Sequence, residues 1–427
     1  MKPMEVTPTT VMGPLMLTNP YTPRQAPHQL DGRAAEHEAI RAKRLAFSMG
    51  GLVAVVTAAV SLPASVSAAP GGVPGNKPSF SPDVSANGRF VVFGSDATNL
   101  VPGDTNGRRD VFVRDTQNRT TRLVSKGLNG RQSNGASYFT NISDDGRFVS
   151  FVSRASNLVL GDTNGKDDVF RADLSTGKII RVSVGAGGVQ ANGASEGARM
   201  SANGNSIVFG SAASNLIRGD TNGVNDVFLR DISTGVTRRL STTSQGNQNL
   251  ASSRAAAISP NGSIATWVGP VGFHDAVYRW DRGTNKVTIS AEPSEGVGTL
   301  RVSNGGPAWA EADTDGYNYY YSIRVYNQPA TSAFIVEYSN NTMLNEFDVS
   351  LWGNMVAFAN PDTYRVEVRD KTTSDLSSDE PLAAVGSAEW RGIAFSSDGN
   401  KVVGVDTAGQ IKLWSWRTNA VTIVSVN

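Results

Sequence analysis

The string Gly-Asp-Thr-Asn-Gly-x-x-Asp-Val-Phe occurs three times in this chain, and the interval between successive copies is constant. The first aspartates of the three copies are Asp104, Asp162 and Asp220. A repeat of this length that is built from short strands is typical of a β-propeller or a similar array, in which each unit packs against its neighbours. The spacing therefore predicts repeated sheets rather than a domain with one central core.

The second repeat shows the expected strands most clearly. Alternating apolar and polar residues at 137–143, 147–152, 168–173 and 178–183 indicate four strands that are separated by turn residues. Asp145-Gly146 is a tight-turn pair between the first two strands. The long loop with the repeated string lies between the second and third strands. Four antiparallel strands in each repeat correspond to one propeller blade.

Asn-Gly or Asp-Gly pairs in the equivalent turn give the number of blades. They begin at Asn87, Asp145, Asn203 and Asn261, at the same constant interval, and the pair returns at Asp398 after a gap that holds three shorter repeats without the long loop. The sequence thus predicts an all-β propeller of four-stranded antiparallel blades over 78–427. Seven blades are expected, with six as the alternative because 296–386 diverges. The expected blades are 78–135, 136–195, 196–252, 253–294, 295–343, 344–387 and 388–427.

Composition narrows the classes of function. A net charge of +1 argues against a nucleic-acid binder, and the absence of cysteine excludes disulfides and zinc-thiolate sites. Apolar residues make up 39% of the chain, which is enough for a core. Equivalent positions of the second strands carry large rings that are expected to pack between blades, namely Phe93, Phe151, Phe209 and Trp267.

The N-terminal part of the chain, up to about position 70, has a different character. Basic residues at 41–44 precede an apolar run over 45–60 and small residues up to Ala69, which is the layout of a secretory signal peptide. The alternative for 41–69 is an uncleaved membrane anchor, because the apolar run is long for a signal peptide. Residues 1–40 are polar and rich in proline, and we expect them to be disordered.

The repeats resemble a known family. Ser-x-Asp/Asn-Gly-Arg-Phe-Val-x-Phe, followed by Ser-Asn-Leu-Val-x-Gly-Asp-Thr-Asn-Gly-x-x-Asp-Val-Phe, is similar to the WD40-like (PD40) repeats of TolB-type β-propellers. The match is strong over about 80–250 and over 393–403. The resemblance implies a secreted or periplasmic propeller that acts as a non-catalytic scaffold for other proteins. Some propellers of this type are fused to peptidase domains, and the sequence shows none.

The repeated string is also a candidate metal site. Two carboxylates and one amide oxygen recur close together in the sequence around a glycine, a set of ligands that suits calcium. Leu160 and its equivalents Pro102 and Arg218 stand where integrin-type calcium loops carry their first acidic residue. The alternative is structural, since Asp and Asn side chains also cap loop amides in Asx-turns. The candidate calcium ligands are Asp104, Asn106, Asp110, Asp162, Asn164, Asp168, Asp220, Asn222 and Asp226.

Strand order predicts where these loops lie. In an antiparallel four-stranded blade, the loops between second and third strands emerge on the same face as the connections between blades, so we expect both sets on one binding face near the axis. The favoured function is a monomeric, secreted or periplasmic scaffold for a protein or cell-envelope partner, with membrane contact only if 41–69 is uncleaved. The alternative is a secreted carbohydrate-active or other hydrolytic enzyme with acidic residues near the axis. His274 is the only histidine beyond residue 40, which disfavours histidine-based catalysis.

Overall fold

The computed structural model of this chain divides into Met1–Val66 and Ser67–Asn427. The structure describes residues 72–426 except for 244, 273, 292–296, 305, 315–318, 326–333, 339–346, 351–354, 361–364, 371–382 and 386–389. The predicted disordered extension 1–40 and the predicted signal peptide or anchor 41–69 lie outside the described residues. Within the described residues, no helix is long and apolar enough to cross a membrane.

The described residues form seven sheets, each made of four consecutive strands that pair antiparallel in chain order. The strands of the first three sheets are β1 (Ser79–Val84), β2 (Phe90–Ser95), β3 (Asp110–Asp115), β4 (Thr120–Leu123), β5 (Ser137–Ile142), β6 (Phe148–Ser153), β7 (Asp168–Asp173), β8 (Ile179–Arg181), β9 (Ser195–Met200), β10 (Ser206–Ser211), β11 (Asp226–Asp231) and β12 (Val236–Arg239).

The strands of the other four sheets are β13 (Arg254–Ile258), β14 (Ile264–Val271), β15 (His274–Asp281), β16 (Lys286–Ala291), β17 (Val297–Ser303), β18 (Gly306–Thr314), β19 (Tyr319–Val325), β20 (Phe334–Tyr338), β21 (Phe347–Val349), β22 (Met355–Asn360), β23 (Arg365–Asp370), β24 (Ala383–Val385), β25 (Arg391–Phe395), β26 (Lys401–Val405), β27 (Ile411–Ser415) and β28 (Ala420–Ile423). Short 3-10 turns lie at Leu128–Gly130 and Ala186–Gly188. In the fourth blade β14 and β15 form a tight hairpin that pairs Val271 with His274, so the long loop is absent there, as expected.

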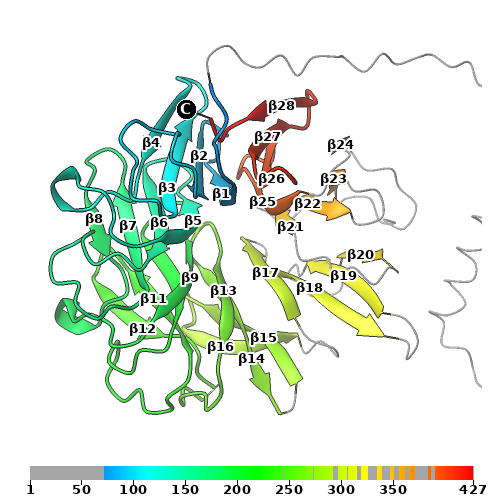
Figure 1. The fold of residues 1–427 in the computed structure, drawn as a ribbon. Coiled ribbons are helices and arrows are strands. Elements are labelled where there is room, and N and C mark those ends of the chain that lie inside the picture. Colours follow the sequence, from blue (N-terminus) through cyan, green and yellow to red (C-terminus); the bar gives the residue numbers. More distant parts are fainter. Residues whose placement is uncertain are drawn as a thin grey trace, which may run out of the picture. The chain divides into compact units, whose positions relative to one another are not determined.

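The sheets are the blades of a propeller, with their first strands around a common axis and their fourth strands towards the rim (Figure 1). Each first strand contacts the first strand of the next blade, from β1 and β5 to β21 and β25, and β25 contacts β1. The ring is therefore closed. The predicted all-β propeller of four-stranded antiparallel blades is confirmed, and no blade combines strands from both ends of the described chain.

Large aromatic rings fill the space between blades. Second-strand rings that are fully buried stack on rings of the third strand, which lie opposite them in the ladder. The pairs are Phe93–Phe112, Phe151–Phe170, Phe209–Phe228 and Trp267–Tyr278, with ring centroids 5.6 to 5.9 Å apart. The positions predicted to form the core are thus confirmed, and a cluster that includes Phe93 and Val403 joins the first blade to the last.

The predicted Asn-Gly and Asp-Gly turns join the first two strands of their blades. Their glycines have φ between 68° and 73°, namely Gly88, Gly146, Gly204, Gly262 and Gly399. This left-handed conformation favours glycine because other residues clash there through Cβ. A Cβ on Gly146 would lie 2.2 Å from the ring of Phe90, so this turn packs directly on the preceding blade.

The two ends of the propeller meet without a covalent link. The segment 124–136 connects the first blade to the second, and in this first connection Lys126 forms an isolated bridge with Gln132. The connections after the second and third blades repeat this bridge. At the closure Pro74 and Val426 form the same kind of bridge. Asn76 then exchanges hydrogen bonds with Thr98, as Asn134, near the end of the first connection, does with Ser156. Residues 74–76 therefore take the place of a connection between blades.

Candidate functional site

Two sets of loops in the first three blades emerge on one face of the propeller. They are the loops 96–109, 154–167 and 212–225 between second and third strands and the connections 124–136, 182–194 and 240–253 between blades. The Gln132 side chain accepts a hydrogen bond from the Thr105 amide at 3.2 Å, and equivalent glutamines of the next two repeats accept the same bond from Thr163 and Thr221. The expected common face is confirmed, and we call it the loop face.

The predicted calcium ligands form a repeated Asx-turn. Asn106 Nδ2 donates a hydrogen bond to Asp110 Oδ2 at 2.6 Å, while Asn106 Oδ1 accepts one from the Arg108 amide at 2.9 Å. Asn164 and Asn222 donate to Asp168 and Asp226 in the same way, each at 3.0 Å. The amide nitrogen therefore faces the carboxylate, which is the geometry of the structural alternative. Calcium binding by these nine residues stays a prediction.

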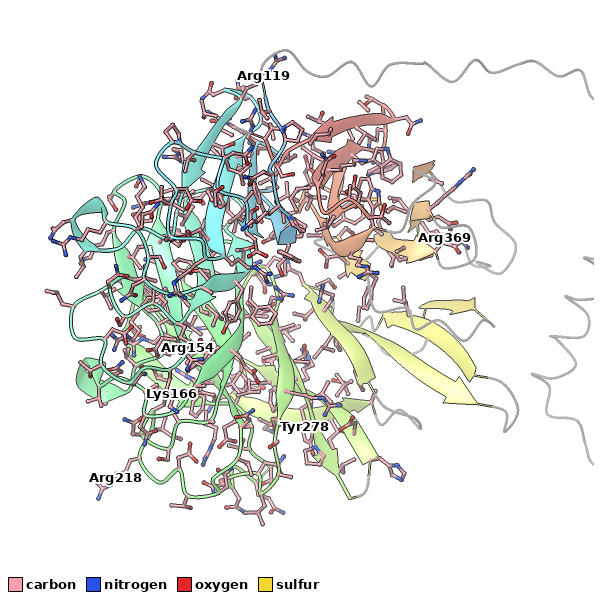
Figure 2. The ribbon with its side chains drawn as sticks, in the orientation of Figure 1. Arg119, Arg154, Lys166, Arg218, Tyr278 and Arg369 are labelled. Atoms are coloured by element: carbon pink, nitrogen blue, oxygen red, sulfur yellow. The ribbon has the colours of Figure 1, made fainter. Side chains whose placement is uncertain are left out.

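The loops 96–109, 154–167 and 212–225, which carry the candidate calcium ligands and which we call the acidic loops, lie away from the axis. Ser125, directly after the outer strand β4, donates a hydrogen bond to Asp110 at 2.6 Å, and Ser183 does the same for Asp168 at 2.5 Å. The carboxylates thus lie beside the third and fourth strands, which form the outer half of each blade. Arg218, next to the third acidic loop, lies at the rim (Figure 2). The expectation that these loops gather near the axis is wrong, because the second-to-third strand loop is one strand removed from it.

In the second and third acidic loops, an arginine of the fourth strand neutralises both carboxylates. Arg181 lies 3.5 Å from Asp162 and 3.8 Å from Asp168. Arg239 lies 3.2 Å from Asp220 and 3.3 Å from Asp226. All these side chains are at most 8% exposed, so each guanidinium is buried with its two carboxylates. The ion pairs offset part of the cost of burying these charges.

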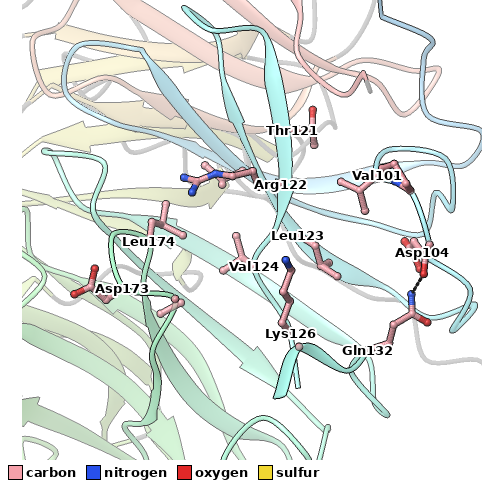
Figure 3. Close-up of a pocket in the computed structure, with 16 residues that line it drawn as sticks. Val101, Asp104, Thr121, Arg122, Leu123, Val124, Lys126, Gln132, Asp173 and Leu174 are labelled. Atoms are coloured by element: carbon pink, nitrogen blue, oxygen red, sulfur yellow. Dashed lines mark hydrogen bonds between the residues drawn. The ribbon is translucent and has the colours of Figure 1, made fainter. Parts of the chain in front are cut away.

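The first acidic loop has no such arginine. Asp104 is 5% exposed, and no side-chain hydrogen bond to either of its carboxylate oxygens is formed by the described residues. Burial raises the pKa of Asp104, which the nearby Asn106 amide only partly opposes, and burial together with the Asp104 charge raises the pKa of Asp110 to about 6. Asp104 and Gln132 lie together at one end of a cavity of about 480 Å³ (Figure 3). Within the described residues, no three His, Cys, Asp or Glu side chains converge as a metal site.

A second polar cluster surrounds the axis, and sequence reasoning missed it. Side chains of innermost strands accept hydrogen bonds from backbone amides of the next blade: Asp83 from Ile142 at 2.7 Å, Asn141 from Met200 at 2.8 Å, and Asp348 from Phe395 at 2.8 Å. These bonds tie neighbouring blades together at the centre of the ring. The recurrence of polar residues at 83, 141 and 199, inside strands and at the interval of the repeat, could have revealed this cluster.

Charges of both signs meet in this axial cluster. Arg301 lies 3.4 Å from Asp348. Burial and, to a smaller extent, the Asp348 charge raise the pKa of Asp83 to about 6, while the Ile142 amide and the Arg199 charge oppose this rise. Burial and the neighbouring Arg301 lower the pKa of Arg199 to about 10. The axial carboxylates are thus bound to arginines and backbone amides.

The innermost strand bulges at the same position in six blades, including the register shift between Val297 and Leu300, and five of these bulges contain a residue with positive φ. The residues with positive φ are Ser81 (47°), Phe139 (54°), Gly197 (60°), Ala255 (52°) and Gly392 (60°). Bulky residues rarely adopt this conformation because of steric clashes, and four of the five positions carry small residues. Phe139 is the exception, and it is 45% exposed, with its ring packed edge-on against Tyr138.

Large aliphatic side chains are exposed on the loop face. Leu160 of the second acidic loop is 86% exposed, and Leu250 of the third connection is 80% exposed. Leu128 of the first connection is 37% exposed, and Val189 of the second connection is 54% exposed. The backbone that carries them is held by hydrogen bonds, for example from the Leu128 amide to the Asn157 carbonyl at 2.8 Å. The loop face therefore presents apolar side chains on an ordered backbone.

The geometry defines this chain as a β-propeller of four-stranded blades. No family model matches the chain, and no curated protein is significantly similar to it. Many solved structures are similar. An oligogalacturonate lyase in complex with manganese matches with a TM-score of 0.53 and 12% identity, over 78% of this chain and 86% of that one. The oligogalacturonate lyase of Vibrio parahaemolyticus matches with a TM-score of 0.51 and 12% identity, over 80% and 90%.

TolB of Acinetobacter baumannii is also among the similar structures. The identity is 22% and the TM-score 0.37, over 58% of this chain and 51% of that chain, so the matched region spans about half of that structure. At this TM-score the match carries no argument, and the TolB-like resemblance rests on the repeats of the sequence. Identities this low concern the fold alone, and the lyases carry no argument about a reaction of this chain.

Proposed function

We propose that this chain is an exported, non-catalytic propeller scaffold that binds a protein partner of the cell envelope through its loop face. The proposal of export comes from the signal-peptide pattern at 41–69, which lies outside the described residues. The proposal of a binding surface comes from the exposed apolar side chains of the first three blades.

The observation that carries the proposal is Phe139. An exposed phenylalanine at φ 54° has an unfavourable backbone conformation, and the equivalent positions carry Ser, Gly, Ala and Gly. Backbone strain of this kind costs about 1–3 kcal/mol and tends to be kept at functional sites. Exposed aromatic rings are frequent anchors of protein interfaces. Phe139 lies in the half of β5 that is nearer to the loop face.

The exposed aliphatic side chains extend this surface outwards from the inner strand. Leu160 and Val189 belong to the second repeat and Leu250 to the third, and all three share one face. Apolar side chains that stand out of an ordered polar backbone fit a protein surface better than a sugar, which is recognised mainly through hydrogen bonds. The partner that fits is therefore a folded protein with an apolar patch.

Single substitutions on the two faces test this function. Phe139→Gly and Leu160→Ser should each reduce the amount of partner recovered from native envelope by about tenfold, because each removes an apolar anchor. Val236→Ser is the matched control, since Val236 is 45% exposed on the outer strand and follows a turn of the opposite face. Equal recovery for all variants would contradict the proposal.

A turnover assay tests the enzymatic alternative in parallel. The wild-type chain should show no turnover of polysaccharide or peptide panels. If turnover is found, and if Asp348→Asn abolishes it while the melting temperature is retained, the chain is an enzyme that acts at its axis and the scaffold proposal is wrong.

A further inference from the structure

The three acidic loops differ at one position of the fourth strand. At the same distance along the chain from Asp104, Asp162 and Asp220, that strand carries Leu123, Arg181 and Arg239, respectively. The repeats are otherwise alike in this region, since all three keep the two aspartates, the asparagine and the serine after the fourth strand. The first loop thus keeps the carboxylates and lacks the cation.

Buried carboxylates need a compensating positive charge. Removal of water from an ionised carboxylate costs several kcal/mol unless a cation or several hydrogen bonds replace it. Arg239 supplies such a charge to Asp220 and Asp226 at 3.2 and 3.3 Å. The presence of a guanidinium at this point in two loops shows that the site has room and electrostatic demand for one cation.

The first loop leaves this demand unmet by its own side chains. Both oxygens of Asp104 are buried and accept no side-chain hydrogen bond among the described residues, only the Asn106 amide lies near them, and no ion pair there involves Asp104. Gln190 Nε2 donates to Asp162 in the second loop at 3.0 Å, but Gln132 Nε2 donates to the Gly103 carbonyl instead. Asp104 therefore presents a buried carboxylate without a cation beside Asp110.

We propose that a calcium ion binds between Asp104 and Asp110 in the first blade only, in the place that Arg181 and Arg239 occupy in the next two blades. The carboxylates of Asp104 and Asp110 are its protein ligands. Asn106 is not a ligand, because its oxygen accepts the Arg108 amide and its nitrogen faces Asp110.

The surroundings favour calcium over a transition metal. The two proposed ligands offer only carboxylate oxygens, and calcium tolerates the irregular geometry that two carboxylates and water provide. The adjoining cavity of about 480 Å³ gives the ion access and space for its water ligands; it is lined by Asp104, Leu123 and Gln132 and also by the basic Arg122 and Lys126, for which no ion pair with Asp104 is seen among the described residues. With two protein carboxylates, the dissociation constant should be in the range of about 0.1–1 mM that extracellular calcium modules show.

Calcium titration of the full chain tests the site. Titration calorimetry should give one calcium ion per chain. The melting temperature should rise by about 3 °C at calcium about thirtyfold above the dissociation constant, and excess chelator should reverse this rise. Magnesium at the same concentration is the control and should have a smaller effect. Three ions per chain would overturn the assignment to the first blade.

Leu123→Arg converts the first loop into a copy of the other two. This variant should bind no calcium, and its melting temperature should be unaffected by calcium or chelator. Leu123→Met is the matched control, since it has similar length without charge and should keep one ion per chain. Calcium binding by the Leu123→Arg variant would contradict the proposal.

Arg239→Leu tests the same relationship in the opposite direction. Loss of the guanidinium leaves Asp220 and Asp226 in the state of the first loop, so calcium stoichiometry should rise from one ion to two. If the wild-type chain takes up no calcium in the calorimetric titration at millimolar calcium, the first carboxylate pair binds no calcium ion and the proposal is wrong.

Discussion

The hydroxyl of Thr121 donates a hydrogen bond of 2.5 Å to the carbonyl oxygen of Val426, although 305 residues separate them in the sequence. Thr121 lies on β4 of the first blade, and Val426 follows the last strand of the final blade. The same bond recurs inside the ring, where Thr237 donates to the Val184 carbonyl at 2.6 Å. The closure therefore uses a contact that also joins two covalently connected blades.

Thr121→Val should destabilise the propeller by about 1 kcal/mol, because it leaves the Val426 carbonyl with one donor fewer. Urea unfolding measures this change. Thr237→Val is the control, since it removes the equivalent bond between the second and third blades and should cost about the same. If Thr121→Val is neutral while Thr237→Val is not, the two ends do not meet in solution.

Phe139→Gly should raise the stability of the chain by about 1 kcal/mol, because glycine adopts φ 54° without strain. Gly197→Ala provides the reverse change at the equivalent position of the third blade, where φ is 60° and a Cβ would meet no atom within 4 Å. It should cost about 1 kcal/mol through the backbone alone. Thermal unfolding of both variants would contradict this account if the two shifts had the same sign.

The sequence predicts the architecture well because its strongest signals are local. Gly146 and its equivalents indicate tight turns, and the alternating residues on either side of them indicate paired strands. The strands of each blade can therefore be predicted from short segments that recur at a constant interval. The buried rings follow from the same alternation, as Phe151 shows. These inferences need no knowledge of contacts between distant residues.

The site was harder to predict because it depends on contacts across strands. In the sequence Leu123 is one apolar residue among many. Only the ion pairs of Arg181 with Asp162 and Asp168 show that a leucine at the equivalent position leaves the first acidic loop without a guanidinium. The radial position of the acidic loops does not follow from the sequence, because strand order gives the face and not the distance from the axis. The role of Asp83 is hard to recognise in the sequence because its partner, the Ile142 amide, belongs to the next blade.

Gly135→Ala should destabilise the propeller by about 2–3 kcal/mol. A Cβ at this position would lie 2.5 to 2.7 Å from backbone atoms of Arg154 and Ala155, which cannot move without disturbing the loop face. Gly283→Ala is the control, because its Cβ would contact only a side-chain oxygen of Asp281 at 3.4 Å, and its effect should be small. Equal melting temperatures for the two variants would show that the first connection is loosely packed.

The axial carboxylate of Asp83 should make stability depend on pH. Its pKa is raised from 3.8 to about 6 in the folded chain, mainly by burial, so the folded state binds more protons than the unfolded state between about pH 4 and 6. The free energy of unfolding therefore falls as the pH rises through this window. Asp110 acts in the same direction, whereas the pKa of Asp115 is lowered to about 2 by Arg89, so Asp115 adds stability as the pH rises from about 2 to 4.

Asp83→Asn should remove this axial contribution. The amide oxygen of asparagine can accept the Ile142 amide, as Asn141 accepts the Met200 amide in the next blade at 2.8 Å. The variant should increase the free energy of unfolding at pH 7 by about 1–3 kcal/mol. Because Asp83 is partly exposed, solvent screening makes this increase smaller than the free energy that corresponds to its full pKa shift. Urea unfolding between pH 4 and 7 with chelator present measures it, and Asp115→Asn is the control that should leave the slope in this window unchanged. A wild-type chain whose stability rises from pH 4 to 6 would show that the axial carboxylate is not destabilised by burial.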